Sequence, residues 1–321
     1  MEKNFYQPLS ANVAPKFGAP TTFMRLPQRE DASGLDACFY GLPMDWGTSA
    51  RSGTRLGPRQ VRAESTQIRP YNMGTGAGPF SSLSIADIGD APLNPYNLLK
   101  SVEAIEEFVT KKIIDFNCIP LAIGGDHTVL LPILRAVAKK SGPVCLIHVD
   151  AHADTNDVMQ GETIAHGTPV RRAFEECLII PDHSIQIGLR GSGYSAEDFD
   201  WGKQKGIRVV EAEKCWHKSL TPLMSEVRQL VGNRPTYLSF DIDALDPAYA
   251  PGTGTLEVGG LNPIQALEII RGCQGINLVG CDCVEVSPPY DPYGRTATLA
   301  ANLLFEMLCV LPGANYKGSA V

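Results

Sequence analysis

The sequence predicts an α/β protein of three layers, in which a mostly parallel β-sheet carries helices on both faces. From about residue 83 onward, short apolar segments of strand length alternate with longer segments whose apolar residues recur at helical spacing. Short segments such as Val144–Val149 are mainly apolar, as expected for strands that are buried on both faces. This strand–helix order is typical of parallel sheets with right-handed crossovers.

The expected elements follow in chain order. We expect strands over these segments: Leu83–Ile88, Ile119–Ile123, Val144–Val149, Ser184–Leu189, Arg208–Val210, Tyr237–Ile242 and Asn277–Val286. Helical or amphipathic spacing covers these segments: Asn97–Phe116, Thr128–Ala138, Pro169–Leu178, Ser195–Lys205, Leu220–Val231 and Thr296–Leu311. One more helix is expected to begin after Asn262, because Asn at the N-cap, Pro263 at the first position and Gln265 at the third form a strong start signal.

We expect one domain over residues 37–321, because no linker, internal repeat or low-complexity tract interrupts this pattern. Residues 1–36 are rich in proline and lack periodicity, so they are predicted to form an arm on the surface or across a subunit contact. The segment Gly41–Arg62 combines glycines, prolines and arginines, and is predicted to be a structured loop region whose role its spacing does not give.

Composition excludes several classes of function. The chain of 321 residues has a formal net charge of −7 and no long basic run, which argues against nucleic acid or an anionic membrane surface as its partner. No apolar stretch is long enough to span a bilayer, and the first residues lack the apolar core of a signal peptide. The nine cysteines are an odd number and lie mostly in apolar segments, so we interpret them as reduced packing residues of a cytoplasmic protein.

Acids and histidines gather where the expected strands end. Asp150, His152 and Asp154 directly follow the strand Val144–Val149, and alternate residues of an extended chain share one face. Asp241 and Asp243 have the same spacing at the end of another strand. Because ligand sites in open α/β sheets lie at the carboxyl ends of strands, we expect these side chains to converge.

A third group, Gly124-Gly125-Asp126-His127, follows the strand that begins at Ile119. Carboxylates crowded at one sheet edge repel each other unless cations neutralise them. Four carboxylates and two imidazoles suit a pair of divalent ions, and the hard oxygen donors without a thiolate favour Mn²⁺ over a structural Zn²⁺.

These segments resemble the ureohydrolase family, which includes arginases, agmatinases and guanidino-acid hydrolases. The segments that match are Gly124–His127, Val149–Asp154, Ser239–Pro247, Glu285–Pro289, Pro251–Gly254 and Gly53–Pro58. The resemblance extends from about residue 38 to 310. It implies an arginase-like sheet of about eight mostly parallel strands, a dinuclear manganese centre and a homo-oligomer, often a trimer or hexamer.

The resemblance also implies a set of ligands. One Mn²⁺ would be held by His127, Asp150, Asp154 and Asp241. The other would be held by His152, Asp150, Asp241 and Asp243, so that Asp150 and Asp241 bridge. Two ions about 3.5–4 Å apart can share a water and lower its pKa towards neutrality, and the resulting hydroxide would attack the guanidinium carbon. Asp154 could accept a hydrogen bond from that hydroxide.

Hydrolysis of a guanidinium expels an amine, which leaves only when it is protonated. Of the six histidines, His127 and His152 belong to the ligand set, and three others are interpreted as structural: His148, His183 and His217. His166 remains, and it matches the proton-shuttling histidine of the family. By the same resemblance, Glu285 pairs with the N–H groups of the guanidinium, a fork that a carboxylate fits well.

The substrate tail is expected to contact the loop 155–165. Residues 191–194 carry no acid that could hold an α-ammonium group, so arginine is disfavoured as substrate. Asn156, Asp157 and Met159 resemble guanidinobutyrases and guanidinopropionases, and a Met in place of a larger aromatic would leave room for 4-guanidinobutyrate. Met159 could equally be a residue that fills a gap. Arg69 and Arg190 are weak candidates for a carboxylate tail.

Four alternatives to 4-guanidinobutyrate hydrolysis stay open at this point. An agmatinase or a 3-guanidinopropionase would use the same chemistry on another tail. A deacetylase on a related fold would use one zinc ion and a tyrosine, and a regulatory metal-binding oligomer would be expected to lack a ligand. The complete ligand set and Glu285 favour the hydrolase of guanidino compounds.

Overall fold

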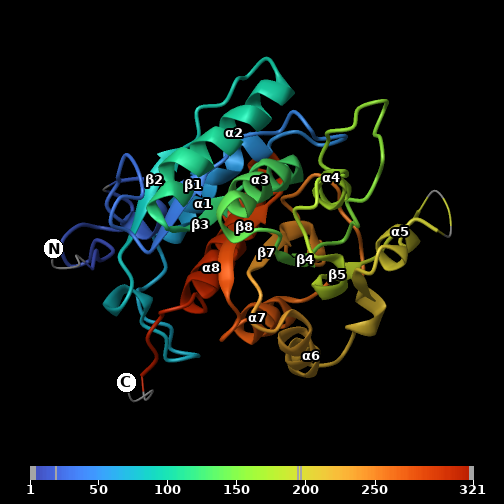
Figure 1. Cartoon of the computed structure of the whole chain (residues 1–321). Helices are drawn as coiled ribbons and strands as arrows, with labels where there is room; N and C mark the ends of the chain where they lie inside the picture. The colour runs from blue at the N-terminus through green and yellow to red at the C-terminus, as the bar shows by residue number, and fades with distance from the viewer. Residues whose placement is uncertain (1–4, 19, 194, 196, 318–321) are drawn as a thin grey trace.

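An eight-stranded sheet forms the centre of the molecule in the computed structural model, which describes residues 5–18, 20–193, 195 and 197–317 (Figure 1). The strands are β1 (Ala37–Gly41), β2 (Ile85–Asp90), β3 (Ile119–Ile123), β4 (Cys145–Val149), β5 (Ile185–Leu189), β6 (Arg208–Glu211), β7 (Thr236–Asp241) and β8 (Leu278–Val284). Their order across the sheet is β2-β1-β3-β8-β7-β4-β5-β6, and all pairings between these strands are parallel. The expected fold class is confirmed.

Helices cover both faces of this sheet. The helices are α1 (Gly57–Ser65), α2 (Leu98–Lys112), α3 (Leu130–Ser141), α4 (Pro169–Glu175), α5 (Asp200–Gln204), α6 (Thr221–Val231), α7 (Pro263–Gly272) and α8 (Arg295–Cys309). One layer contains α2, α3 and α4, and the opposite layer contains α1, α6, α7 and α8 (Figure 1). The short α5 packs beside β6.

The strands are apolar because each of their faces packs on a helix layer. In β1, Ala37 and Phe39 belong to the core under α1 and α6–α8, whereas Cys38 and Tyr40 belong to the core under α2–α4. All four side chains are fully buried. Alternate residues of one strand therefore enter two separate cores, as expected for a parallel sheet covered on both sides.

Several local expectations are met and others need correction. Asn262 and Gln265 form the expected capping box at the start of α7. The helix expected over Ser195–Lys205 is shorter, since α5 begins at Asp200, and residue 196 lies outside the described part of the chain. Strand β1 was not predicted, although the run Ala37–Gly41 is apolar apart from its tyrosine hydroxyl and glycine.

The segment expected to be a loop region over Gly41–Arg62 contains the start of a helix. A 3₁₀ turn over Thr54–Leu56 leads directly into α1, whose first turn contains Pro58. Proline is favoured in the first helical turn because that position needs no N–H donor. Residues 42–53 remain a loop, which lies between β1 and α1.

Part of the expected N-terminal arm packs into the core. Phe23, Met24 and Leu26 are buried, and the ring of Phe23 stacks on Phe39 with their centroids 3.9 Å apart. Residues 1–4 of that arm lie outside the described residues. In the described ranges, no helix has both the length and the apolar character needed to cross a membrane.

The strand order brings the important strand ends together. Strands β3, β8, β7 and β4 are consecutive neighbours in the middle of the sheet and run in the same direction. Their carboxyl ends therefore meet at one edge, which is where open parallel sheets place their ligands.

A first prediction concerns Arg62, which attaches helix α1 to strand β2. Arg62 is buried and binds Asp87 of β2 through two hydrogen bonds of 2.8 and 3.0 Å. Replacing Arg62 by Met would leave the buried Asp87 carboxylate without its cation, so we expect the free energy of unfolding to fall by about 3–5 kcal/mol.

Urea denaturation of both variants measures this difference. The matched control is Arg208→Met, which removes an exposed ion pair with Glu226 and should cost less than about 1 kcal/mol. Equal losses in the two variants would show that Asp87 does not depend on Arg62.

Candidate metal centre and active site

The structure brings the sequence-predicted acids and histidines to one edge of the sheet. His127 follows β3, Asp150 follows β4, Asp241 ends β7 and Glu285 follows β8. These are the four central strands, so residues far apart in the sequence become neighbours. All four side chains are buried.

His127 is the centre of the first group of possible ligands. Its Nδ1 lies 3.0 Å from Asp150 Oδ2, 3.0 Å from Asp154 Oδ2 and 3.3 Å from Asp241 Oδ2. Four electronegative atoms from three loops therefore surround one point. What they can bind depends on whether Nδ1 carries a proton.

The hydrogen bonds behind His127 determine its tautomer. Ser239 Oγ donates to Asp282 Oδ1 at 2.7 Å, and the same Oγ lies 2.9 Å from His127 Nε2. Because the serine proton is committed to the carboxylate, Oγ accepts a hydrogen bond from Nε2–H. In the neutral ring, the lone pair of Nδ1 then points at the carboxylates.

A lone pair facing three carboxylate oxygens is unfavourable unless a cation lies between them. His127 Nδ1, Asp150 Oδ2 and Asp154 Oδ2 are buried and have no hydrogen-bond partner within the described chain. Donor atoms on adjacent corners of an octahedral cation with bonds of about 2.1 Å lie about 3.0 Å apart, which matches the observed separations. These residues therefore fit a divalent metal ion.

The titration behaviour of two of the acids, Asp241 and Asp154, agrees with this interpretation. Burial raises the pKa of Asp241 well above its usual range, and the neighbouring carboxylates of Asp243 and Asp150 raise it further. Burial also raises the pKa of Asp154, with Asp150 adding to the effect. Without a cation, these carboxylates are too crowded to ionise together.

A second group of possible ligands lies beside the first. His152 Nδ1 is 3.1 Å from Asp243 Oδ2 and 3.5 Å from Asp150 Oδ1. Thr255 Oγ1 donates to Asp243 Oδ2 at 3.2 Å, which helps to orient that carboxylate. Asp150 presents one oxygen to each group, so it lies where a bridging ligand would.

His148 also approaches this cluster, but its hydrogen bonds give it a different role. Gln186 Nε2 donates to Ala153 O at 2.7 Å and lies 2.9 Å from His148 Nδ1, which therefore accepts. The ring proton is then on Nε2, which lies 3.0 Å from Asp150 Oδ2 without the geometry of a hydrogen bond. His148 thus contacts Asp150 with an N–H group, as the sequence interpretation of a buried structural histidine requires, and is not available as a ligand.

His166 and Glu285 form the second chemical feature of the site. His166 Nδ1 lies 3.2 Å from Glu285 Oε1, and the same oxygen accepts a hydrogen bond of 2.8 Å from the His127 backbone N–H. Burial by itself lowers the pKa of His166, but Glu285, with the more distant charges of Asp154 and Asp126, outweighs it and raises the pKa to about 9. At neutral pH this imidazole is therefore protonated and can act as an acid.

The backbone is strained at both of the acids expected to act in catalysis. Asp154 has a φ of 54° and Glu285 a φ of 64°, in the left-handed region that side chains other than Gly and Asn rarely adopt. Such residues cost about 1–3 kcal/mol each and occur mainly at functional sites.

A cavity of about 150 Å³ opens onto the cluster. Its lining consists of Ser49, His127, His152, Asp154, Asn156, Met159, His166, Gly167, Asp241 and Thr255. Glu285 Oε2 is buried with no hydrogen-bond partner among the described residues, and a Cβ added to Gly254 would lie 3.8 Å from it. The volume suits a small planar group rather than a large ligand.

The residues expected to hold the substrate tail are only partly brought together. Asn156 Nδ2 donates to Gly167 O at 3.1 Å, and a Cβ at Gly167 would lie 2.8 Å from Met159 Sδ, so Gly167 makes room for Met159 in the cavity. Asp157 instead forms ion pairs with Arg171 and Arg172 at 3.3 and 2.8 Å. Asp157 is outside the cavity lining and anchors the loop.

The two arginines proposed for a carboxylate tail are also placed elsewhere. Arg190 is buried, and its guanidinium donates to backbone carbonyls that include Asp243 O at 2.7 Å and Glu257 O at 2.7 Å. Arg69 is exposed beside Pro70, which lines a hollow near the C-terminal segment. Neither arginine lines the cavity over the metal cluster.

Sequence reasoning missed Ser49 and Thr255 as lining residues. Ser49 lies in the segment Gly41–Arg62, which was predicted only as a loop region, and Thr255 directly follows the family-like segment Pro251–Gly254. Their serine and threonine hydroxyls carry no pattern of their own, so only the folded chain could identify them.

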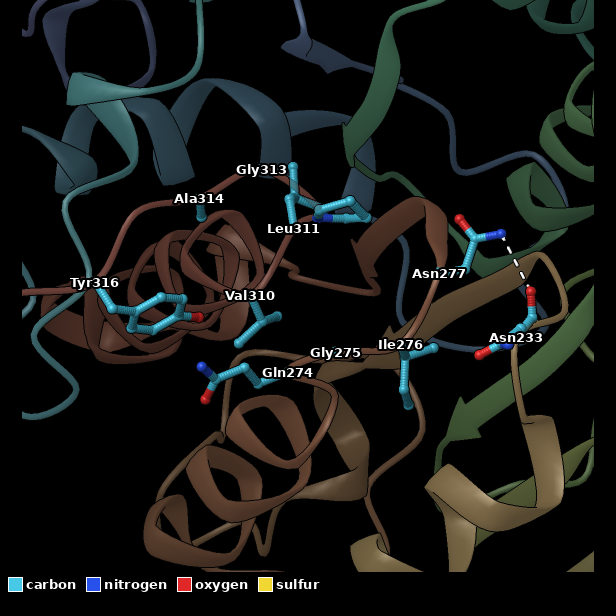
Figure 2. Close-up of a pocket in the computed structure, with 11 residues that line it drawn as sticks. Asn233, Gln274, Gly275, Ile276, Asn277, Val310, Leu311, Gly313, Ala314 and Tyr316 are labelled. Atoms are coloured by element: carbon cyan, nitrogen blue, oxygen red, sulfur yellow. Dashed lines mark hydrogen bonds between the residues drawn. The ribbon is translucent and has the colours of Figure 1, made fainter. Parts of the chain in front are cut away.

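A larger hollow of about 550 Å³ lies at the other end of the sheet (Figure 2). Asn233, Gln274 and Asn277 contribute amides, and residues 310–314 contribute mostly apolar groups. This lining contains no carboxylate or imidazole, so it cannot repeat the chemistry of the cluster.

Comparison with known proteins agrees with this geometry. The model of the Arginase family matches residues 35–309. Guanidinobutyrase from Pseudomonas aeruginosa is 62% identical over 98% of this chain and 99% of its own length. Mitochondrial agmatinase from Gallus gallus is 57% identical over 96% of this chain and 91% of its own length.

A solved structure supports the same relationship. The proclavaminate amidinohydrolase from Streptomyces clavuligerus is 38% identical and superposes with a TM-score of 0.87, covering 92% of this chain and 100% of that one. The strand order, the acid–histidine cluster and these similarities have one common explanation: the chain belongs to the arginase family.

Proposed function

We propose that this protein is a manganese-dependent amidinohydrolase that converts 4-guanidinobutyrate and water to urea and 4-aminobutyrate. The observation that carries the proposal is the pairing of a divalent-metal cluster with a buried, unpaired carboxylate oxygen, Glu285 Oε2, beside it. A cluster alone would suit many hydrolases. The added anionic group suits a substrate whose reacting carbon is part of a cation.

Six residues would hold the two metal ions. His127, Asp150, Asp154 and Asp241 would hold one ion, and His152 with Asp150, Asp241 and Asp243 the other. The oxygen-rich donor set without a thiolate favours Mn²⁺. When bound, such a pair of cations supplies an ionised water near neutral pH as the nucleophile.

Glu285 would hold the guanidinium. Its Oε1 is engaged by the His127 N–H and by His166, which leaves Oε2 free to accept from the planar N–H groups of the substrate. Charge-assisted pairs of this kind combine binding energy with fixed orientation. Glu285 would thereby place the guanidinium carbon over the metal cluster.

His166 would supply the proton that the departing amine needs. Its imidazolium is stabilised by Glu285, and it lies in the cavity lining with Asp154 and Asp241. After the C–N bond breaks, the amine leaves in a protonated form and His166 is neutral until it regains a proton from solvent.

The tail of the substrate would extend along Asn156 and Met159. Met159 is held in a tight turn by two backbone hydrogen bonds of 2.9 Å with Glu162, so its thioether has a defined position in the cavity. A flexible, unbranched side chain leaves space for a four-carbon acid. Agmatine and 3-guanidinopropionate are the competing tails, and a urea-release assay over these compounds and arginine tests the choice.

We also propose that the protein is a cytoplasmic homo-oligomer, a trimer or a hexamer. Support comes from the family resemblance and from the cysteines, which are all thiols and mostly buried. Light scattering on the purified protein measures the mass directly, and a monomer would contradict the oligomer proposal.

A second prediction concerns the expected metal ligands. Asp150→Asn removes a charge that faces both groups of the cluster, and Asp241→Asn removes one that faces His127, so we expect manganese content to fall and urea release to drop by more than about 100-fold. Metal analysis after reconstitution and a urea assay measure the two effects. Asp157→Asn is the matched control, since its carboxylate pairs with arginines outside the cavity and metal content should not change. Normal turnover in either cluster variant would contradict the dinuclear assignment.

Prediction for pH. His166 must be protonated to act as an acid, and its raised pKa keeps it protonated below about 9. The ratio kcat/KM, which reports the protonation of the free enzyme, should therefore fall as pH rises through about 9, with metal kept saturating. Glu285, Asp154 and Asp126 are the carboxylates whose charge supports the proton on this ring. His166→Asn should keep its manganese, lose most of its turnover and lose this alkaline limb; an unchanged kcat would exclude His166 as the acid.

A fourth prediction concerns the length of the substrate tail. Met159→Phe should lower kcat/KM for 4-guanidinobutyrate by about 10–200-fold, because a ring removes space from a cavity of about 150 Å³. The loss for the shorter 3-guanidinopropionate should be smaller. Met159→Leu, which keeps the volume, is the control. Equal losses of kcat/KM for both substrates would mean that Met159 does not determine selectivity for tail length.

A further inference from the structure

The Ser49 hydroxyl contacts the proposed acid on the side away from Glu285. Ser49 Oγ lies 2.8 Å from His166 Nε2, and the Ser49 backbone N lies 3.3 Å from the same atom. His166 Nδ1 is already engaged by Glu285 Oε1. Both ring nitrogens of His166 are therefore occupied by the protein, and neither is directed freely into the cavity.

The position of Ser49 is fixed by its loop. Gly47 N–H donates to Asp126 Oδ2 at 3.0 Å, and Gly47 O accepts from His166 N–H at 3.1 Å. A Cβ at Gly47 would lie 2.0 Å from Thr128 Oγ1, so only glycine allows this close approach. The loop that carries Ser49 is thus attached to the backbone of His166 itself, two residues from the hydroxyl.

Ser49 also lies where the departing nitrogen is expected. It lines the cavity, yet it is exposed, which places it at the rim. The nitrogen that leaves is the one that bears the tail, and the tail must point from the cluster towards the opening. His166 is buried behind Ser49, with only 10% of its side chain exposed.

We propose that Ser49 is the catalytic hydroxyl through which His166 delivers its proton to the departing amine; this proposal rests on the proposed amidinohydrolase function. Ser49 Oγ accepts the proton from His166 Nε2–H while its own proton passes to the amine nitrogen. The C–N bond breaks, the amine gains one proton, the imidazolium becomes imidazole and the serine is regenerated. A hydroxyl can carry out both transfers because it donates and accepts at one atom.

Because Ser49 also contacts His166 through its backbone N–H, an experiment can distinguish proton transfer by the hydroxyl from mere orientation of the His166 ring. In the neutral ring, Nε2 can accept from that N–H, and the N–H is retained in any substitution at Ser49. In the protonated ring, Nε2–H needs an acceptor, and in the described chain its acceptor is Ser49 Oγ. A Ser49→Ala variant should therefore keep His166 oriented and lose the transfer.

The test compares Ser49→Ala, Ser49→Thr and the control Ser52→Ala, all loaded with manganese and assayed for urea from 4-guanidinobutyrate. Ser52 lies on the same loop, is exposed and is outside the cavity lining. We expect Ser49→Ala to lower kcat by about 10²–10⁴-fold, the range of a lost acid–base step, with KM and manganese content unchanged. Ser49→Thr keeps a hydroxyl and should recover most of the loss, and Ser52→Ala should behave like the native protein.

The dependence of kcat on the deuterium content of the solvent gives a second readout. Two protons move together in the proposed transfer, so the native enzyme should show a curved dependence, and Ser49→Ala a linear one. Turnover in Ser49→Ala equal to that of Ser52→Ala, or a loss that Ser49→Thr does not recover, would overturn the role of Ser49 while leaving the proposed function intact. A native protein that releases no urea from any of the guanidino compounds would overturn both.

Discussion

The site depends on one electrostatic constraint: His127 Nδ1 and the carboxylates around it lie so close that a proton or a cation must lie between them, and the carboxylates accordingly raise the pKa of His127. Asp150 and Asp154 each place an oxygen 3.0 Å from this nitrogen. The chain from His127 through Ser239 to Asp282 keeps the proton on the far side of the ring. The fold thus stores repulsion that binding of divalent cations would relieve, and metal binding should be coupled to the stability of this sheet edge.

The fold makes this arrangement possible through its strand order. Strands β3, β8, β7 and β4 lie side by side, so four loops begin within reach of one another although they are dispersed over more than half of the sequence. In the loops after two of these strands, Asp154 and Glu285 adopt left-handed backbone conformations. The two well-packed cores on either side of the sheet supply the stability that such local strain requires.

The sequence predicted the parts of the site that follow from local geometry. Asp150 and His152 are two residues apart after a strand, and this spacing, together with the parallel fold, is enough to expect them at one edge. The loop over residues 42–53 could not be assigned, because the contact between Ser49 and His166 joins residues 117 positions apart. The ion pairs of Asp157, which was predicted to contact the substrate tail, could not be foreseen for a related reason: nothing in its sequence neighbourhood revealed that Arg171 and Arg172 would pair with its carboxylate.

In the proposed function, Glu285 would join substrate binding and proton transfer in a single unit. Its Oε1 accepts from the His127 backbone N–H, next to the cluster, and supports the proton on His166, while its Oε2 is buried without a hydrogen-bond partner among the described residues. A guanidinium bound at Oε2 would reduce the negative charge felt by His166, and so would lower the affinity of the imidazole for its proton. Substrate binding would then make His166 a stronger acid at the moment when an acid is needed. One strained carboxylate can in this way link substrate binding to the release of the leaving group.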